Sequence, residues 1–167
     1  MNSYRAGAGL LLALVVVSIV HIAVYYPALL AVVASHFDLN GKVNGTMSRE
    51  AFVGVYAGVV AIMAVVFYGI GLLLPVLPNS SINMPHKDFW LAQERRSATL
   101  ESVAAFLVWI GAATLLFIMA TIHITIMFQL GQISNINILL YPMLAVYFVA
   151  LTTWTLLFVR KFRNIAA

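Results

Sequence analysis

The sequence contains no cysteine and very few charged residues. Charged side chains make up 8% of its 167 residues, whereas a soluble domain of this size carries about 25%. The absence of cysteine excludes disulfides, iron–sulfur clusters, thiolate zinc sites and cysteine nucleophiles. Hydrophobic residues make up 63% of the chain, and its mean hydropathy is +1.03. This composition excludes an ordinary soluble enzyme and a disordered tail, and it indicates an integral membrane protein.

Four apolar stretches are long enough to cross a bilayer, which takes about 20 residues of helix. All five acidic residues lie between these stretches or at their edges, as is typical of separate membrane spans. We therefore predict a single all-α membrane domain over residues 1–167. Its four transmembrane helices are expected at about 7–26, 51–74, 99–129 and 136–160, with an outer loop at 36–50 and an inner loop at 75–97.

Short interfacial segments are expected after the first helix and before the third. Pro27 disfavours helix at the residue before it, so the first helix should end near Tyr25–Tyr26. Residues 28–35 would then form a short apolar segment at the outer surface. On the inner side, Asp88 is placed to cap a short helix that leads toward the third span.

The outer loop contains two Asn-Gly pairs, Asn40-Gly41 and Asn44-Gly45. Asn-Gly is a strong signal for a tight turn, because both residues tolerate positive φ angles. The sequence therefore predicts two consecutive tight turns in this loop.

The distribution of Lys and Arg predicts which loops face the cytoplasm. With four spans, the two termini share one side of the membrane. That side carries seven of the nine basic residues, namely Arg5, Lys87, Arg95, Arg96, Arg160, Lys161 and Arg163. The excess places both termini in the cytoplasm and the 36–50 loop outside. Because the basic residues lie at helix ends without interleaved aromatics, we expect no nucleic-acid partner.

Two histidines, His21 and His123, fall within predicted spans, where ionisable groups require a reason. Together with His36 and Asp38 of the outer loop, they would supply a ligand set suited to zinc or copper. Alternatively, each imidazole simply bonds a hydroxyl, a carbonyl or water. No metal or other cofactor is assigned on this evidence. No Ser/His/Asp set, phosphate loop or paired carboxylates can be assembled, so we expect no enzyme and no catalytic residues.

Gly54 and Gly58 form a Gly-x-x-x-Gly pattern in the second span. This spacing lets two helices approach closely, either within one chain or between two chains. We expect it to serve helix packing inside the chain.

The outer loop and its flanks resemble a bacterial membrane family. The matching residues are Tyr25-Tyr26-Pro27, then His36-Phe37-Asp38 nine residues on, then Gly41 and Gly45-Thr46-Met47-Ser48. The family is domain of unknown function 1648, which also occurs at the N-terminus of SdpI-type immunity proteins. An inner segment, Leu77-Pro78-Asn79 with Ile82–Ala92 and Glu94-Arg95-Arg96, looks like a second signature of its stand-alone members. The resemblance implies an outward-facing recognition loop and no known reaction.

The chain departs from the family pattern in one informative place. Where the family carries a polar Leu-Pro-Asp stretch, this chain has the apolar run Ala28–Val33. An apolar segment in an otherwise exposed loop suggests burial against lipid or a partner chain. We therefore expect a non-catalytic protein of the bacterial inner membrane that binds other membrane proteins, as an accessory subunit of a larger complex.

Two alternatives remain open at this stage. One is a stand-alone, SdpI-like immunity or sensor protein with an outward recognition loop. The other is a metal- or cofactor-binding redox subunit that uses the outer-side histidines. Besides the lipid bilayer, the expected contacts with partner chains come from two segments. They are His36, Phe37, Asp38, Asn40 and Gly41 outside, and Phe89, Trp90, Arg95 and Arg96 inside.

Overall fold

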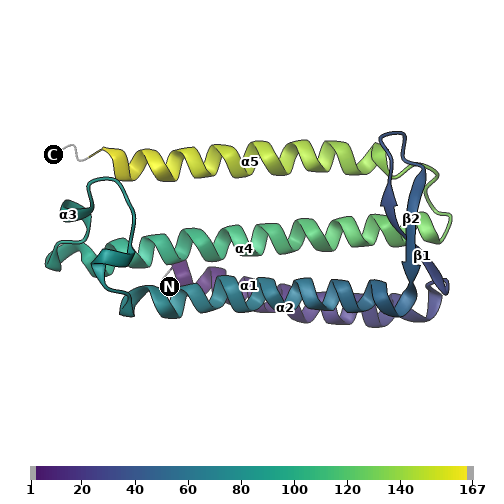
Figure 1. The fold of residues 1–167 in the computed structure, drawn as a ribbon, viewed down its shortest axis with the longest axis horizontal. Helices are drawn as coiled ribbons and strands as arrows, with labels where there is room; N and C mark the ends of the chain where they lie inside the picture. The colour runs from purple at the N-terminus through teal and green to yellow at the C-terminus, as the bar shows by residue number, and fades with distance from the viewer. Residues whose placement is uncertain (1–2, 165–167) are drawn as a thin grey trace.

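The computed structural model describes residues 3–164, and four long helices dominate it (Figure 1). Each expected helix is present, with ends displaced by a few residues. The helices are α1 (Ser3–Tyr25), α2 (Arg49–Leu73), α4 (Gln93–Gln129) and α5 (Asn137–Arg163), with a short α3 at Lys87–Trp90. The remaining elements are strands β1 (Val32–Phe37) and β2 (Val43–Ser48) and 3₁₀ turns η1 (Tyr26–Ala28), η2 (Leu74–Val76) and η3 (Asn79–Ser81).

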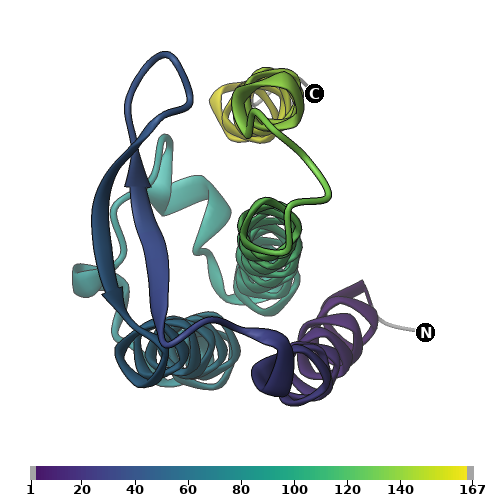
Figure 2. The same ribbon diagram turned by 90° about the vertical axis from the view of Figure 1, so that its right-hand side faces the viewer.

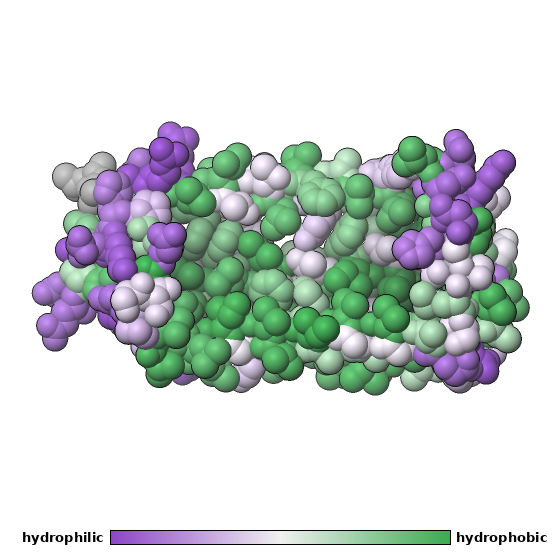
Figure 3. Space-filling model, viewed as in Figure 1, coloured by the Kyte–Doolittle hydropathy of each residue, from purple (hydrophilic) through white to green (hydrophobic). Residues whose placement is uncertain are grey.

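The four long helices are each long and apolar enough to cross a membrane. In the space-filling view, an apolar band fills the middle of the molecule and hydrophilic residues gather at its two ends (Figure 3). This distribution matches a slab of hydrocarbon between two polar interfaces. The chain is therefore a multi-pass membrane protein, and both of its termini lie toward the end that carries α3 (Figure 1).

The first helix ends where the sequence predicts. Helix α1 stops at Tyr25, and η1 places Pro27 in its first turn, where a missing amide donor does no harm. At the start of α2, the Ser48 hydroxyl accepts a hydrogen bond from the Ala51 amide at 3.1 Å, which caps the helix.

The expected all-α fold is wrong in the outer loop, because the residues there form an antiparallel β-hairpin. Strand β1 pairs with β2, and Val32 lies opposite Ser48 while Phe37 lies opposite Val43. The apolar run expected to rest on the membrane surface thus continues into a strand. Its β-branched valines favour extended backbone, and the hairpin satisfies their amides and carbonyls.

Only the first Asn-Gly pair lies in a turn. The Asp38 carboxylate accepts hydrogen bonds from the amides of Asn40 and Lys42, at 2.9 and 2.8 Å, and Gly41 has a φ of 78°. This arrangement closes the hairpin at residues 38–42. Gly45, from the second pair, lies within β2 opposite His36, so the second predicted turn is wrong.

The prediction that Asp88 caps the inner helix is also wrong. The N-cap of α3 is His86, which has a φ of 50°, and Asp88 lies within the first turn. Helix α3 ends at Trp90, and α4 begins only at Gln93, so the two are separate helices.

The helices form a three-helix core with the fourth alongside. Helices α1, α2 and α4 pack together around Leu11, Tyr56, Val108 and Leu115, which are all almost fully buried. Helix α5 packs on α4 and stands apart from α1 and α2, as the view along the helices shows (Figure 2). The α4–α5 contact is largely aromatic: stacked rings pair Phe106 with Phe158 and Phe117 with Tyr147.

The glycines that permit close helix packing differ from those expected. A Cβ at Gly7 would lie 2.6 Å from a Val108 methyl, and one at Gly111 would collide with Phe67. A Cβ at Gly54 or Gly58 would meet nothing within 4 Å. The expectation that this pair packs inside the chain is therefore wrong. Both glycines are exposed on the face of α2 that points away from α1 and α4, where lipid or another chain can contact them.

Candidate partner-binding surfaces

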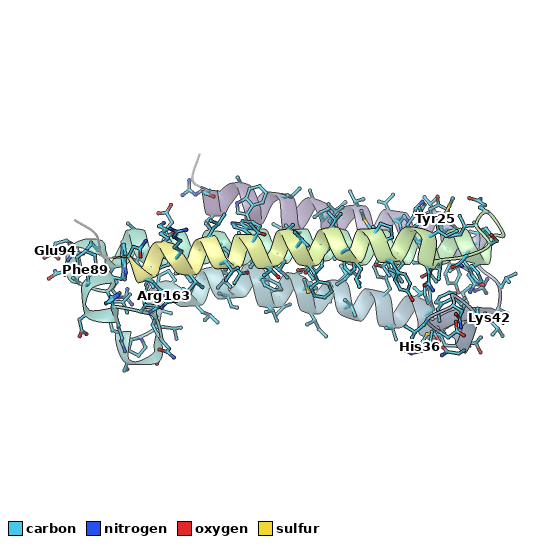
Figure 4. All side chains as sticks on the ribbon, turned by 90° about the horizontal axis from the view of Figure 1, so that it is seen from above. Tyr25, His36, Lys42, Phe89, Glu94 and Arg163 are labelled. Atoms are coloured by element: carbon cyan, nitrogen blue, oxygen red, sulfur yellow. The ribbon has the colours of Figure 1, made fainter. Side chains whose placement is uncertain are left out.

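The two predicted binding segments lie at opposite ends of the molecule. Figure 4 shows His36 and Lys42 of the hairpin at one end and Phe89 and Glu94 at the other. Both segments contact α5, which links them along the length of the molecule.

The hairpin tip is fastened to the start of α5. The Leu39 carbonyl accepts hydrogen bonds from the Asn137 side-chain amide and the Tyr141 hydroxyl, each at 2.9 Å. A Cβ at Gly41 would collide with the side chain of Asn135, so the tip sits closely against the α4–α5 link. The carbonyl of Leu39 thus faces α5, while its side chain is 87% exposed.

Three predicted outer-loop residues have structural roles in the hairpin. Phe37 packs edge-on against Phe128 of α4, with ring centroids 5.1 Å apart. The backbone amides of Lys42 and Asn40 hold the pKa of the Asp38 carboxyl below its usual value. Asn40 thus contributes to the turn through its backbone amide, which donates a hydrogen bond to Asp38. The side chain of His36 is exposed on β1.

The hairpin and its approach expose large apolar side chains outside the long helices. Leu30 and Val32 are 56% and 59% exposed, and Val43 is 40% exposed on the second strand. With Leu39 they make up what we call the hairpin apolar surface. Apolar side chains on a spanning helix can face lipid, whereas exposed apolar side chains outside the spanning helices make this surface a candidate for binding.

The inner segment makes mostly contacts within the chain. The Trp90 indole donates a hydrogen bond to the Phe162 carbonyl at 2.9 Å. Arg96 donates to the Asn79 side chain at 2.9 Å and to the Pro75 carbonyl at 3.0 Å, which fixes the loop after α2. The predicted residues Trp90 and Arg96 are therefore occupied in the fold.

The other two predicted inner residues pair with each other. Arg95 donates to the Phe89 carbonyl at 2.9 Å, and its guanidinium carbon lies 3.9 Å from the centre of the Phe89 ring. This cation–π contact sits at the surface, and a partner can reach the exposed Arg95 side chain.

Of the four proposed metal ligands, the structure brings two together. His21 Nε2 lies 3.1 Å from His123 Nδ1, and the Tyr25 ring packs against both imidazoles. The hairpin residues His36 and Asp38 do not join them. Within residues 3–164, no three His, Asp or Glu side chains are grouped as a metal would require. His21 Nδ1 is buried and has no hydrogen-bond partner among these residues.

Sequence reasoning missed Asn137, Tyr141 and His86, which fasten the two loops to α5. A signal for the first was present: Asn135 and Asn137 are polar residues at the start of an apolar stretch. Asn137 and Tyr141 bond to Leu39, which lies 98 and 102 residues away in the sequence. Sequence spacing therefore does not reveal this pairing.

Comparison with known proteins identifies one segment of the chain. Residues 13–62 match the family model described as Domain of unknown function (DUF1648). The match confirms the resemblance expected from the outer loop, and it covers the C-terminal part of α1, the whole hairpin and the first half of α2. It does not extend to the inner segment at 77–96. No curated protein and no solved structure matches the chain.

Proposed function

We propose that this chain, whose residues 13–62 carry the DUF1648 domain, is a non-catalytic accessory subunit of a larger membrane complex. The observation that carries the proposal is the hairpin apolar surface, formed by Leu30, Val32, Leu39 and Val43. These side chains lie outside the spanning helices, where a partner protein removes them from water more completely than the headgroup region does.

The hairpin is suited to binding because it is held in place before a partner arrives. Its base continues into capped α2, and its tip is bonded to α5 through the Leu39 carbonyl. A rigid surface loses little conformational entropy on association, so more of its contact energy appears as affinity.

We further propose that the protein lies in the inner membrane of a bacterium with both termini in the cytoplasm. The basic residues support this orientation, because seven of nine lie at the α3 end and two lie near the hairpin. The hairpin then faces outward, where an exported protein or the outer part of a neighbouring subunit can reach it.

An alternative within the same class is a stand-alone, SdpI-like immunity or sensor protein. The same hairpin surface then meets an external protein only when one is present. The two possibilities differ in the resting state, because a subunit is always assembled and a sensor is not.

Extraction from the native membrane in a mild detergent tests the subunit proposal. The full chain should migrate in an assembly larger than itself, and Leu39→Asn should release it. Lys42→Gln, a neighbouring change at an exposed polar side chain, should leave the assembly intact. Wild-type chain that runs alone overturns the subunit proposal and leaves the sensor. A Leu39→Asn chain that remains assembled removes the role assigned to the hairpin.

A second candidate, a metal-binding subunit, rests on the contact between His21 and His123. The two imidazole nitrogens lie 3.1 Å apart, and a small outward movement of the rings would let both bind one copper ion. Among residues 3–164 the structure offers no third ligand of the usual kinds. Elemental analysis of the purified chain tests it. Copper or zinc at one equivalent, lost in His123→Phe and kept in His36→Phe, supports the candidate; metal-free protein after loading with either ion removes it.

A further inference from the structure

The end of α5 carries an open groove of about 520 Å³ whose lining changes from apolar to cationic. Leu156 and Val159 form one part of the lining, and Arg160, Arg163 and Asn164 form the other. The side chains that join α5 to α4, Trp154 and Phe158, point the other way, onto Phe106. The groove therefore faces away from α4, toward the surrounding lipid.

The two arginines of the groove have no partner for their charge in the part of the chain that the structure describes. The only ion pair there joins Arg49 and Glu50 near the hairpin, at the opposite end. The neighbouring Lys161 is different, because its ammonium donates a hydrogen bond to the Ser102 hydroxyl of α4 at 2.7 Å. Adjacent residues on one helix thus include both engaged and unengaged cations.

The end of a helix ordinarily repels anions, because its last carbonyls carry partial negative charge. Here three of the last four carbonyls accept hydrogen bonds. The Arg160 carbonyl accepts from the Asn164 amide at 3.3 Å, and the Phe162 carbonyl accepts from the Trp90 indole at 2.9 Å. The Arg163 carbonyl accepts from the His86 ring at 3.1 Å. The inner segment thereby reduces the repulsion that an anion beside Arg160 and Arg163 would meet.

We propose that this groove binds an anionic phospholipid, with its phosphate on Arg160 and Arg163 and an acyl chain along Leu156 and Val159. Guanidinium groups bind phosphate oxygens through paired, charge-assisted hydrogen bonds. The position also fits, since Arg160 and Arg163 lie in the last turn of α5, after its apolar stretch, where a spanning helix meets the headgroup phosphates. A soluble phosphate would use the cationic part alone, whereas a phospholipid fills both parts of the lining.

Native mass spectrometry of the full chain in detergent tests the proposal, with phosphatidylglycerol as the anionic probe and phosphatidylcholine as its zwitterionic counterpart. The chain should bind phosphatidylglycerol more tightly. Each basic residue at an anionic surface contributes roughly fivefold to affinity. Arg160→Gln/Arg163→Gln should therefore weaken phosphatidylglycerol binding by about 25-fold, with little change for phosphatidylcholine.

The matched control removes the same charge elsewhere at this end of the molecule. Lys161→Gln/Lys87→Gln should weaken phosphatidylglycerol binding by about twofold or less, because neither side chain lines the groove. Equal weakening in the two double variants would overturn the proposal in favour of diffuse charge attraction. Unchanged binding in the arginine variant would also overturn it. Displacement of the lipid by an equal concentration of inorganic phosphate would contradict the role of the apolar lining. Thermal unfolding of both variants checks that they remain folded.

Discussion

The hydrogen bonds between α5 and the hairpin tip should decide how often the hairpin opens. Asn137 and Tyr141 each donate to the Leu39 carbonyl at 2.9 Å. One such bond contributes about 1 kcal/mol net. The double variant Asn137→Ala/Tyr141→Phe should therefore lose about 2 kcal/mol of local stability, which raises the population of the open hairpin about 30-fold.

Hydrogen exchange followed by mass spectrometry measures this opening directly. The amides of Asp38 and Gly41 are bonded within the turn, so peptides that cover residues 36–44 report its opening. They should exchange about 30-fold faster in the double variant, while peptides from α4 stay unchanged. Tyr68→Phe is the matched control, because the Tyr68 hydroxyl makes no hydrogen bond among residues 3–164. Unchanged exchange at residues 36–44 in a folded double variant would refute the assigned role of these bonds.

Three further outcomes follow from the fold. The hairpin turn should loosen in acid, because the fold lowers the pKa of the Asp38 carboxyl. Such a group stabilises the fold above its unfolded pKa, near 4, and this contribution is lost as the pH falls through the folded pKa. Hydrogen exchange at the turn should show this pH dependence, and Asp38→Asn should abolish it. Gly111→Leu should lower the melting temperature by several degrees through its clash in the α2–α4 contact, whereas Gly54→Leu should change it little. A maleimide that cannot cross membranes should label Thr46→Cys in intact cells and leave Ser80→Cys unlabelled, and the reverse pattern would invert the proposed orientation.

The long helices could be predicted because their physics is local to each segment. A run of about 20 apolar residues bounded by charges forms a spanning helix in lipid, because a helix satisfies all of its backbone hydrogen bonds within the segment. Pro27 likewise acts on its immediate neighbours, and α1 ends where that effect places it. The family resemblance could also be found from sequence, since it rests on residues close together in the outer loop.

The hairpin could not be predicted in the same way, because its cause is partly distant. The run from Ala28 to Val33 is equally compatible with a surface segment and with a strand. Pairing with residues 43–48 decides for the strand, and Asn137 then fixes the tip from the start of α5. Long-range pairings of this kind leave no periodic signal in a single sequence.

The partner-binding role of the two predicted segments stays a prediction, but the structure shows which of their residues are engaged within the chain. The sequence indicated that both loops matter, but the structure uses Trp90 and Arg96 to hold the chain together. Exposure then separates the residues that remain available, above all Leu39, from those already engaged. Similarly, the Gly54 and Gly58 pattern indicated a helix-packing face, but sequence cannot tell which side of α2 packs against the other helices.

Photo-crosslinking in intact native membranes tests most directly whether the hairpin apolar surface binds a partner protein. A photoreactive residue at position 39 should give one discrete protein crosslink. The same residue at position 146, on the exposed side of α5, should give lipid adducts and no such product. Only lipid adducts at both positions, or the same protein captured equally from both, would contradict a partner-binding hairpin.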